Sequence, residues 1–414
     1  MSESRGGPLA GVKVVELGTL IAGPLCSRML ADFGADVIKI EAPEGGDQLR
    51  QWRKMYPSSF DQSSGGSGQA EGTSLWWYVQ ARNKKSVTLN LRSPEGQEIV
   101  RKFAQEADIV VENFRPGALE KWNIGWPQLS ALNPRLVMVR LSGFGQDGPY
   151  RDRPGFGVVA ESMGGMRYVT GYPDRPPVRL GVSIGDSIAA LHGVIGAMMA
   201  LHQRNANGGS GQYVDVALYE AVFNMMESLI PEFDVLGFRR ERAGNELPGI
   251  TPSNTYPTRD GKFVIIGANN DSIFKRLMST IGRSDLASDA ALATNTGRAP
   301  RARELDQAIE AWTRKHDLST LLAALERAEV PSGRVYDAED IVNDAHYAAR
   351  RMIEQWTLPD GKPMKIPGIV PKLSETPGKT HWLGPKLGEH TAEILERLGY
   401  GESQQKELRQ RGVI

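Results

Sequence analysis

The sequence contains a single cysteine, Cys26, among 414 residues. One cysteine forms no intrachain disulfide, so the chain is not a small secreted domain held together by cross-links, and a reducing compartment suits it. Residues 1–8 are polar and lack the apolar core of a signal peptide. We therefore expect a cytoplasmic protein whose fold depends on packing alone.

Long apolar runs and an excess of either charge are also missing. The longest candidate for a membrane span, Ile188 to Leu201, contains His192 and Gly193. It is shorter than the roughly 18 residues that a span needs, and we interpret it as a buried helix. Lys plus Arg and Asp plus Glu both total 49, which argues against a broad basic surface for nucleic acid. We expect neither a membrane nor a nucleic acid as partner.

Several familiar cofactor and nucleophile motifs are absent. The six histidines are scattered without metal-ligand spacing, so we expect no metal. There is no phosphate-binding P-loop and no Gly-x-Ser-x-Gly elbow. Residues 143–148 match the dinucleotide pattern Gly-x-Gly-x-x-Gly, but Pro149 and Pro154 follow, and a helix cannot open there. The match therefore does not indicate a nicotinamide site, because that site needs a helix N-terminus against the pyrophosphate.

The order of secondary-structure signals predicts an α/β protein. The chain is long enough for two domains. Helices are expected to open at Gly23-Pro24 and at Ser93-Pro94, between apolar segments typical of strands. Strands that alternate with helices indicate a mostly parallel sheet covered on both faces. The predicted strands are residues 12–17, 37–40, 86–91, 108–111, 136–141, 212–217 and 262–267.

Two stretches interrupt this alternation. Ser58 to Gly72 is rich in Ser, Gly and Gln, and it reads either as a surface loop or as an active-site lid. Gly, Pro and Asn cluster between Glu241 and Tyr256, which indicates a domain boundary between Pro231 and Gly249.

Asp186 is the residue with the most informative surroundings. It lies in a turn containing Gly181 and Gly185, directly ahead of a long apolar segment. One interpretation is an acid that caps a helix. The other is a carboxylate nucleophile, since no competing nucleophile is evident. His192 is six residues further on, so a shared helix would not align the two side chains.

Cations gather near two of the predicted strands. Arg82, Lys84 and Lys85 precede one strand, and Asn113-Phe114-Arg115 follows another, with Lys121 one turn later. Singly, each is typical of a surface charge. Together they predict a basic rim on one sheet edge, where a phosphorylated, adenine-containing cofactor would place its phosphates against cations and its base against Phe114.

Short segments spread over the whole chain carry a family resemblance. In order, they are Pro8 to Val14, Ala22-Gly23-Pro24, Phe33 to Glu41, Gly46-Asp47 with Arg50, Asn83 to Ser86, Val111 to Gly117, Asn133-Pro134-Arg135, Ser142 to Gly145, Gly185-Asp186, Pro331, Leu387 to Thr391 and Leu398-Gly399. This order and spacing resemble the family III CoA-transferases, which include formyl-CoA:oxalate, carnitine and succinyl-CoA:dicarboxylate CoA-transferases.

The resemblance implies a fold and an assembly that the composition does not show. A large Rossmann-like domain would be built from both chain ends, residues 1–225 and 336–414, with a smaller α/β middle domain over residues 226–335. Two chains would form an interlocked homodimer, each threading through a ring made by the other.

The resemblance also assigns site residues. The catalytic aspartate falls on Asp186. Contacts to CoA fall on Ile21, Ala22, Leu89, Arg92, Asn113, Phe114, Lys121 and Ser142. Formyl-CoA transferase has Gln at the place of Ile21, Arg at that of Ala42 and Lys at that of Ser142, and these departures argue against formyl-CoA as the donor.

The implied activity moves CoA from an acyl-CoA, with succinyl-CoA favoured, to a small carboxylic or dicarboxylic acid. Asp186 would form an aspartyl anhydride and then an aspartyl-CoA thioester. CoA is a substrate here, and no tightly bound cofactor is expected. Arg50, Arg82 and Arg179 are candidates for holding a second carboxylate.

Two alternatives remain at this point. One is an α-methylacyl-CoA racemase, but racemases carry a His-Asp pair after an Arg-x-Gly turn, and here Arg153-Pro154-Gly155 is followed by Phe156. That difference favours the transferase. The other alternative is a protein that binds CoA esters without catalysis.

Overall fold

The computed structural model describes residues 6–56 and 72–414. The predicted loop or lid, Ser58 to Gly72, lies outside the described residues except for Gly72, so neither interpretation is tested. The chain forms two compact units. Unit 1 consists of Met1–Met166, Leu180–Glu227 and Arg351–Ile414, and unit 2 of Arg167–Arg179 and Ser228–Arg350.

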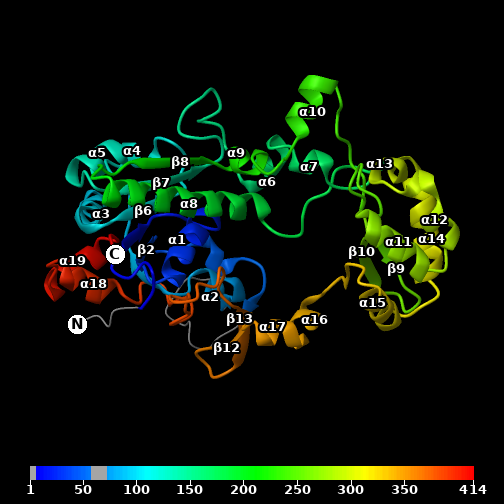
Figure 1. Ribbon diagram of the computed structural model, residues 1–414. Helices are drawn as coiled ribbons and strands as arrows, with labels where there is room; N and C mark the ends of the chain where they lie inside the picture. The colour runs from blue at the N-terminus through cyan, green and yellow to red at the C-terminus, as the bar shows by residue number, and fades with distance from the viewer. Residues whose placement is uncertain (1–5, 57–71) are drawn as a thin grey trace. The chain divides into compact units, whose positions relative to one another are not determined.

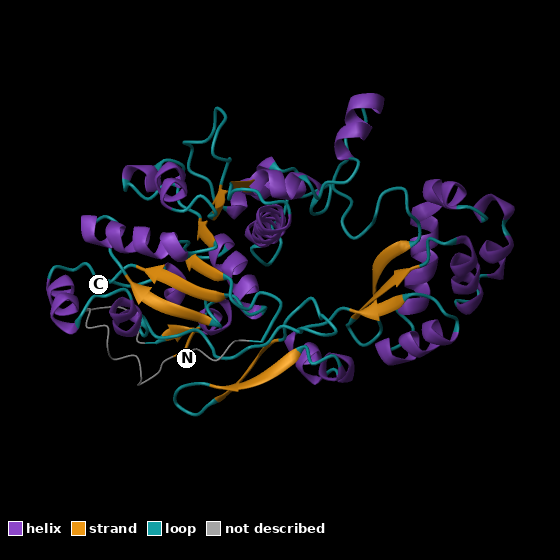
Figure 2. Cartoon of the chain, turned by 60° about the vertical axis from the view of Figure 1, so that its left-hand side comes forward, coloured by secondary structure: helices purple, strands orange, loops and turns teal. Residues whose placement is uncertain are grey.

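Unit 1 is built on a six-stranded sheet in which every neighbouring pair is parallel (Figures 1 and 2). The order across the sheet is β5-β2-β1-β6-β7-β8. This confirms the predicted α/β class with a parallel sheet. The strands are β1 (Lys13–Glu16), β2 (Asp36–Glu41), β5 (Lys84–Thr88), β6 (Ile109–Glu112), β7 (Val137–Ser142) and β8 (Tyr213–Ala217).

Helices cover both faces of this sheet, as the crossovers of a parallel sheet require (Figure 2). Val139 of β7 packs in one core cluster with α1 (Ala22–Asp32) and α8 (Ile184–Ala206). Its neighbour Met138 points to the opposite face. There it packs with α3 (Pro94–Glu106), α5 (Trp126–Leu132), α18 (Thr391–Arg397) and α19 (Glu402–Gln410). The C-terminal helices thus complete the sheet's second layer.

Local sequence explains where these helices begin. Ser93 caps α3, because its hydroxyl accepts a hydrogen bond from the Gly96 N–H, and Pro94 occupies the first turn. The helix predicted at Gly23-Pro24 is α1. The prediction for residues 86–91 was displaced: β5 begins at Lys84, which pairs with Val37 of β2. The sequence pattern gave no strand signal at Lys84, because a charged residue is not expected in a buried strand. Its neutralising partner, Glu16, lies on β1.

The prediction for the apolar segment near Ile188 was partly wrong. Helix α8 begins earlier, at Ile184, and it is buried on one face only. Gly193 and Ala197 face the core, whereas Leu191 and Met199 are exposed. By length and composition α8 could cross a membrane, but a helix that packs in a core passes the same test.

Unit 2 has its own sheet and core. Strands β9 (Ser253–Pro257), β10 (Phe263–Gly267) and β11 (Ser332–Arg334) form an antiparallel sheet in the order β11-β10-β9. Its core includes residues of α11 (Asp271–Thr280), α14 (Ala302–Thr313) and α15 (Leu318–Arg327). Residues 336–350, which the sequence prediction joined to the C-terminal segment, group with unit 2.

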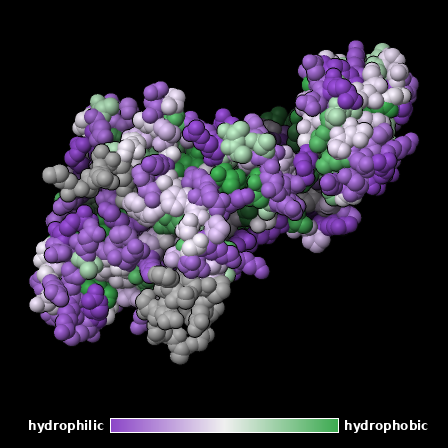
Figure 3. Space-filling model, turned by 90° about the horizontal axis from the view of Figure 1, so that it is seen from below, coloured by the Kyte–Doolittle hydropathy of each residue, from purple (hydrophilic) through white to green (hydrophobic). Residues whose placement is uncertain are grey.

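The face drawn in Figure 3 mixes hydrophilic and hydrophobic side chains. Shorter elements complete the described chain. They are η1 (Gln48–Gln51), β3 (Met55–Tyr56), β4 (Thr73–Ser74), α2 (Leu75–Gln80), α4 (Ala118–Lys121), α6 (Gly157–Met163), α7 (Met166–Val169), α9 (Leu218–Phe223), α10 (Leu229–Leu236), α12 (Ser284–Ser288), η2 (Ala290–Leu292), α13 (Asn295–Arg298), η3 (Ala299–Arg301), α16 (Ala338–Asn343), α17 (Ala345–Ala349), β12 (Ile353–Thr357) and β13 (Pro363–Pro367).

Candidate active site

The strand order of unit 1 reverses between β1 and β6. From β1 the chain continues to β2 on one side, whereas β6, β7 and β8 lie on the other side. In open α/β sheets, ligands bind at such a reversal, outside the carboxyl ends of the strands. The loop after β1 and the loop after β6 therefore define the first candidate region.

These two loops are joined by the side-chain amide of Asn113. Its Oδ1 accepts a hydrogen bond from the Thr19 N–H at 2.8 Å, and its Nδ2 donates to the Thr19 carbonyl, also at 2.8 Å. A Cβ atom on Gly18 would lie 3.1 Å from Asn113 Oδ1, so a glycine permits the close approach. Asn113 therefore lies at the predicted edge of the sheet, but its side-chain amide is hydrogen-bonded to the backbone of Thr19.

The loop after β1 leads directly into α1. Ile21 occupies the N-cap position without a side-chain cap, and the first residues of the helix are Ala22 and Gly23. The side chains of Ile21 and Ala22 are buried. These two predicted CoA contacts therefore have only backbone groups to offer at the helix start, where amide N–H groups favour an anion.

Phe114 and Lys121 lie next to this region. The Phe114 ring meets Trp122 edge-on, with the ring centroids 5.3 Å apart. The Phe114 N–H donates to Glu112 Oε2 at 2.8 Å, and Arg140 Nε donates to Glu112 Oε1 at 2.8 Å. Burial raises the pKa of Glu112 to about 7, although the Arg140 guanidinium opposes the shift. Lys121 is exposed.

The other predicted CoA contacts differ in exposure. Arg92 is exposed, and its charge is open to solvent. Leu89 is buried. Ser142 is also buried, and its hydroxyl accepts a hydrogen bond from the Gly145 N–H at 3.0 Å, which shapes the turn after β7. The glycine-rich turn has positive φ at Gly145 and Gly148, and the next helix, α6, begins only at Gly157.

Asp186 lies in the first turn of α8. The N-cap position belongs to Ser183, so the interpretation of Asp186 as the capping residue was wrong. The carboxylate is half-buried and packs against the start of α6: a Cβ atom on Gly157 would lie 2.2 Å from Asp186 Oδ2. Any side chain at residue 157 would collide with the carboxylate.

Both helix starts belong to the same edge of the sheet. Helix α1 leads from β1 to β2, and α8 leads into β8, so each returns the chain to the amino edge and begins at the carboxyl edge. The two helices pack together, since a Cβ atom on Gly193 would lie 3.1 Å from Cys26 Sγ. Asp186 and the start of α1 are thus placed at the carboxyl edge.

The predicted basic rim was wrong for two of its members. Arg82 is buried and donates two hydrogen bonds to Asp32, at 2.8 and 2.7 Å. Lys84 is also buried, with Glu16 as partner. Arg50, proposed for a second carboxylate, donates twice to Glu41 at 2.8 Å. Acids on neighbouring elements neutralise these cations, and the sequence does not reveal such pairings.

Arg179, the third candidate for a second carboxylate, is exposed and belongs to unit 2. Among residues 6–56 and 72–414, no three His, Cys, Asp or Glu side chains are grouped so that they could hold a metal ion.

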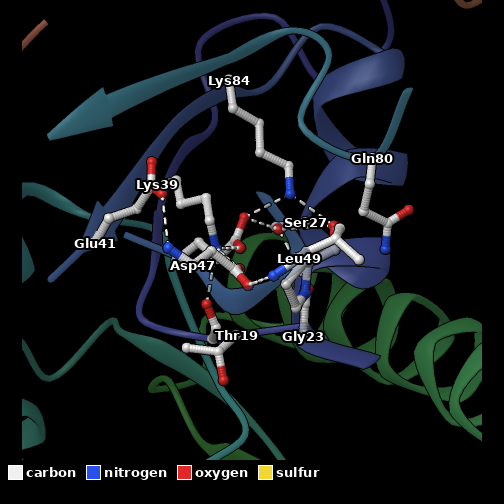
Figure 4. Close-up of polar contacts among 12 residues, drawn as sticks. Thr19, Gly23, Ser27, Lys39, Glu41, Asp47, Leu49, Gln80 and Lys84 are labelled. Atoms are coloured by element: carbon white, nitrogen blue, oxygen red, sulfur yellow. Dashed lines mark hydrogen bonds and ion pairs between the residues drawn. The ribbon is translucent and has the colours of Figure 1, made fainter. Parts of the chain in front are cut away.

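A buried cluster of charges lies beneath the loop after β1 (Figure 4). It contains three cations and three acids: Lys39, Lys84 and Arg50 with Glu16, Asp47 and Glu41. Sequence reasoning missed this cluster. The only available signal was that charged residues recur within three apolar strand segments.

The pairing in this cluster shifts several pKa values. Burial raises the pKa of the Glu16 carboxyl, but the ammonium groups of Lys39 and Lys84 lower it more strongly, and the net pKa lies below the ordinary value. Burial lowers the pKa of Lys84 to about 8, against the attraction of Glu16. Asp47, beside Lys39, has a lowered pKa despite its burial.

Comparison with known proteins identifies the family. The model of CoA-transferase family III matches residues 9–391. The succinyl-CoA–D-citramalate CoA-transferase of Chloroflexus aurantiacus is 48% identical over 408 residues, covering 98% of each chain. The succinate–glutarate CoA-transferase of Agrobacterium fabrum is 35% identical, covering 95% of this chain and 96% of that protein.

A solved structure gives the same result. The crystal structure of a CAIB/BAIF family protein from Brucella suis superposes with a TM-score of 0.81 at 34% identity, covering 95% of this chain and all of that one. The chain belongs to CoA-transferase family III. The predictions of the family and of an enzyme that transfers CoA are therefore confirmed.

Proposed function

We propose that this enzyme transfers CoA from succinyl-CoA to a small dicarboxylic acid, with Asp186 as the nucleophile. The carrying observation is the Asp186 carboxylate, held at the start of α8 on the carboxyl edge of the sheet against the backbone of Gly157. The relatives named for succinyl-CoA with citramalate and for succinate with glutarate support this substrate class.

The donor half of the reaction has two covalent steps. An Asp186 oxygen attacks the thioester carbonyl of succinyl-CoA, the C–S bond breaks, and CoA leaves as a thiolate. The product is a mixed anhydride of Asp186 and succinate. The thiolate then attacks the Asp186 carbonyl, the anhydride C–O bond breaks, and succinate leaves while CoA stays bound as an aspartyl thioester.

The acceptor half runs in reverse. The acceptor carboxylate attacks the aspartyl thioester, releasing the thiolate and forming a second anhydride. The thiolate attacks the acceptor's carbonyl, which yields the new acyl-CoA and restores Asp186. No proton, metal or redox partner enters the balance. Because a carboxylate is a weak nucleophile, the position of Asp186 must supply much of the rate.

We infer that the acyl-CoA occupies the carboxyl edge at the β1/β6 reversal. The backbone N–H groups of Ile21 and Ala22 suit an anionic or carbonyl group at the start of α1. The exposed cations Arg92 and Lys121 suit phosphates, and Phe114 offers an aromatic face. Leu89 and Ser142 are buried and would act through the shape of the loops that follow their strands.

Of the three arginines predicted to bind a second carboxylate, two are unsuited to that role, and Arg179 stays a prediction. Arg50 and Arg82 are held by buried acids, and releasing either would leave a buried charge unpaired. Arg179 is exposed.

The same geometry favours transfer over the two alternatives. A racemase needs a second proton carrier after the Arg-Pro-Gly turn, but Phe156 stands there, with its side chain 67% exposed. A protein that only binds CoA esters has no need of a carboxylate held so closely at residue 186.

We propose a homodimer with cytoplasmic location. One face of α8 exposes Leu191, Ile195, Met198 and Met199, which are spaced as one stripe along the helix. A second copy of the chain would cover this apolar stripe.

The test is an assay of CoA exchange with mass-resolved CoA esters. Succinyl-CoA is mixed with a panel of acids that includes citramalate, malate, glutarate, itaconate and mesaconate. We expect a new acyl-CoA from at least one dicarboxylate and, with succinyl-CoA alone, a CoA adduct on Asp186. Exchange of an α-hydrogen in one acyl-CoA without any acceptor would instead establish a racemase.

A further inference from the structure

The buried charges beneath the loop after β1 reach the loop itself through Lys39. This lysine comes from β2, and its side chain is 1% exposed. Its ammonium group donates to Glu16 Oε1 at 2.6 Å and to the Gly18 carbonyl at 2.8 Å, and it lies 2.7 Å from Asp47 Oδ2. Figure 4 shows the side chains of Lys39, Asp47 and Lys84 converging in this cluster.

Asp47 holds the next part of the loop. The Leu20 N–H donates to Asp47 Oδ1 at 3.0 Å and lies 3.2 Å from Oδ2, and the Leu49 N–H donates to Oδ1 at 2.9 Å. Leu20 has φ of 64°, in the left-handed region that residues with a side chain rarely adopt. Such a conformation persists when its surroundings fix it, and here the buried carboxylate does so.

The rest of the loop is fixed from other elements. Asn113 pairs with both backbone groups of Thr19. Gln80 Nε2 donates to the Ile21 carbonyl at 3.2 Å. Each residue from Gly18 to Ile21 is therefore held by a side chain from outside the loop.

A gain in folding stability does not by itself explain why Lys39 and Asp47 are buried as a pair. Buried ion pairs contribute little net stability, because desolvation of the two charges offsets their attraction, and apolar replacements of the same volume are often as stable. A buried pair that fixes one backbone conformation at a binding edge has a second use, since a preset site loses less entropy on binding.

We propose that Lys39 and Asp47 are positioning residues that preset the Gly18–Ile21 loop, and with it the start of α1, for the acyl-CoA. The inference rests on the proposed function, in which the backbone at Ile21 and Ala22 meets the CoA ester. Neither residue touches the reacting atoms. Both act through the backbone of the Gly18–Ile21 loop, in which Leu20 has a left-handed conformation.

Asp47→Asn tests the proposal, because the amide keeps the shape of the side chain but removes its charge opposite Lys39. Asp32→Asn is the matched control. Asp32 forms a buried pair with Arg82 at the opposite end of α1. We expect Asp47→Asn to raise the Kd for CoA, measured by calorimetry, and the KM for succinyl-CoA by tenfold or more.

The same variant should change the KM for the acceptor acid and the saturated kcat by less than about threefold. Asp32→Asn should leave all these constants within about twofold of their native values, even if it lowers the melting temperature by as much as Asp47→Asn does. Equal effects of the two variants on CoA binding, or no effect of either, would overturn the positioning role. A native protein that binds no CoA would instead refute the proposed function.

Hydrogen exchange on the native protein covers the case in which Asp47→Asn does not fold. The Leu20 amide is expected to be protected to the same degree with and without CoA. Fast exchange that slows only when CoA is added would show that the ligand orders the loop, and the proposal would be wrong.

Discussion

Gly157→Ala is the sharpest test of the position of Asp186. Gly157 has no left-handed φ, and it begins α6, so its backbone accepts alanine and gains helix propensity. The added Cβ, however, would lie 2.2 Å from Asp186 Oδ2. An ordinary contact between these atoms is at least about 3.0 Å, so the carboxylate oxygen or its helix must move by about 0.8 Å.

A displacement of this size has a large effect on a reaction that depends on position. A shift of about 1 Å can cost about 100-fold in rate, or about 2.7 kcal/mol in the activation free energy. We expect formation of the aspartyl-CoA adduct from succinyl-CoA to slow by about that factor in single-turnover measurements. The Kd for CoA should change by less than about threefold, because the start of α1 is untouched.

Gly181→Ala is the matched control. Gly181 lies five residues before Asp186, and a Cβ atom there would meet nothing within 4 Å. It should react at the native rate. The reasoning is refuted if Gly157→Ala forms the adduct at the native rate, or if both variants slow equally.

Three further predictions follow from the same structure. Asp186→Asn should lose at least about 10³-fold in CoA exchange and form no covalent adduct, as mass spectrometry of the protein would show, while still binding CoA; native-level exchange would disprove its role. Glu112 has a folded-state pKa of about 7, raised by burial above its ordinary value, so its contribution to stability is full below about pH 4.5 and is lost as the pH rises through 7. Glu112→Gln should therefore flatten the fall in the free energy of unfolding over this window, by about 3 kcal/mol at most, in urea titrations at several pH values; an unchanged slope would contradict the assignment. Met199→Glu, which places a charge on the exposed stripe of α8, should shift a native dimer toward monomer in analytical ultracentrifugation, and a variant as dimeric as the native protein would exclude this stripe from the interface.

Much of unit 1 could be predicted because its strands and helix starts carry local signals. The strand predicted at residues 136–141 is present as β7, Val137–Ser142, with its bounds one residue further along the chain. The Ser93-Pro94 pair marked the start of α3 because a cap and a first-turn proline act within one turn of chain. The missing helix after Gly148 could be predicted for the same local reason, since two prolines follow.

The candidate site was harder to predict, because its geometry depends on distant pairs. Asp186 stood out by its own surroundings, yet Gly157, the residue that sets its position, lies 29 residues earlier and carries no chemical signal. Sequence alone assigned Ser183 no role, although it precedes α8 and holds the N-cap position.

Arg50, Arg82 and Lys84 illustrate why charge is an uncertain guide to a binding surface. From the sequence alone, these three residues are predicted to be cations available to phosphates or carboxylates. In the fold, Glu41, Asp32 and Glu16 reach them from other elements, at sequence separations of 9, 50 and 68 residues. A buried cation needs such a partner, because desolvation without one costs several kcal/mol. The exposed Arg92 and Lys121 have a different status: they keep their solvation and can exchange it for a ligand's phosphate. In this family III enzyme, the buried cations are therefore paired with acids of the fold, whereas Arg92 and Lys121 remain exposed.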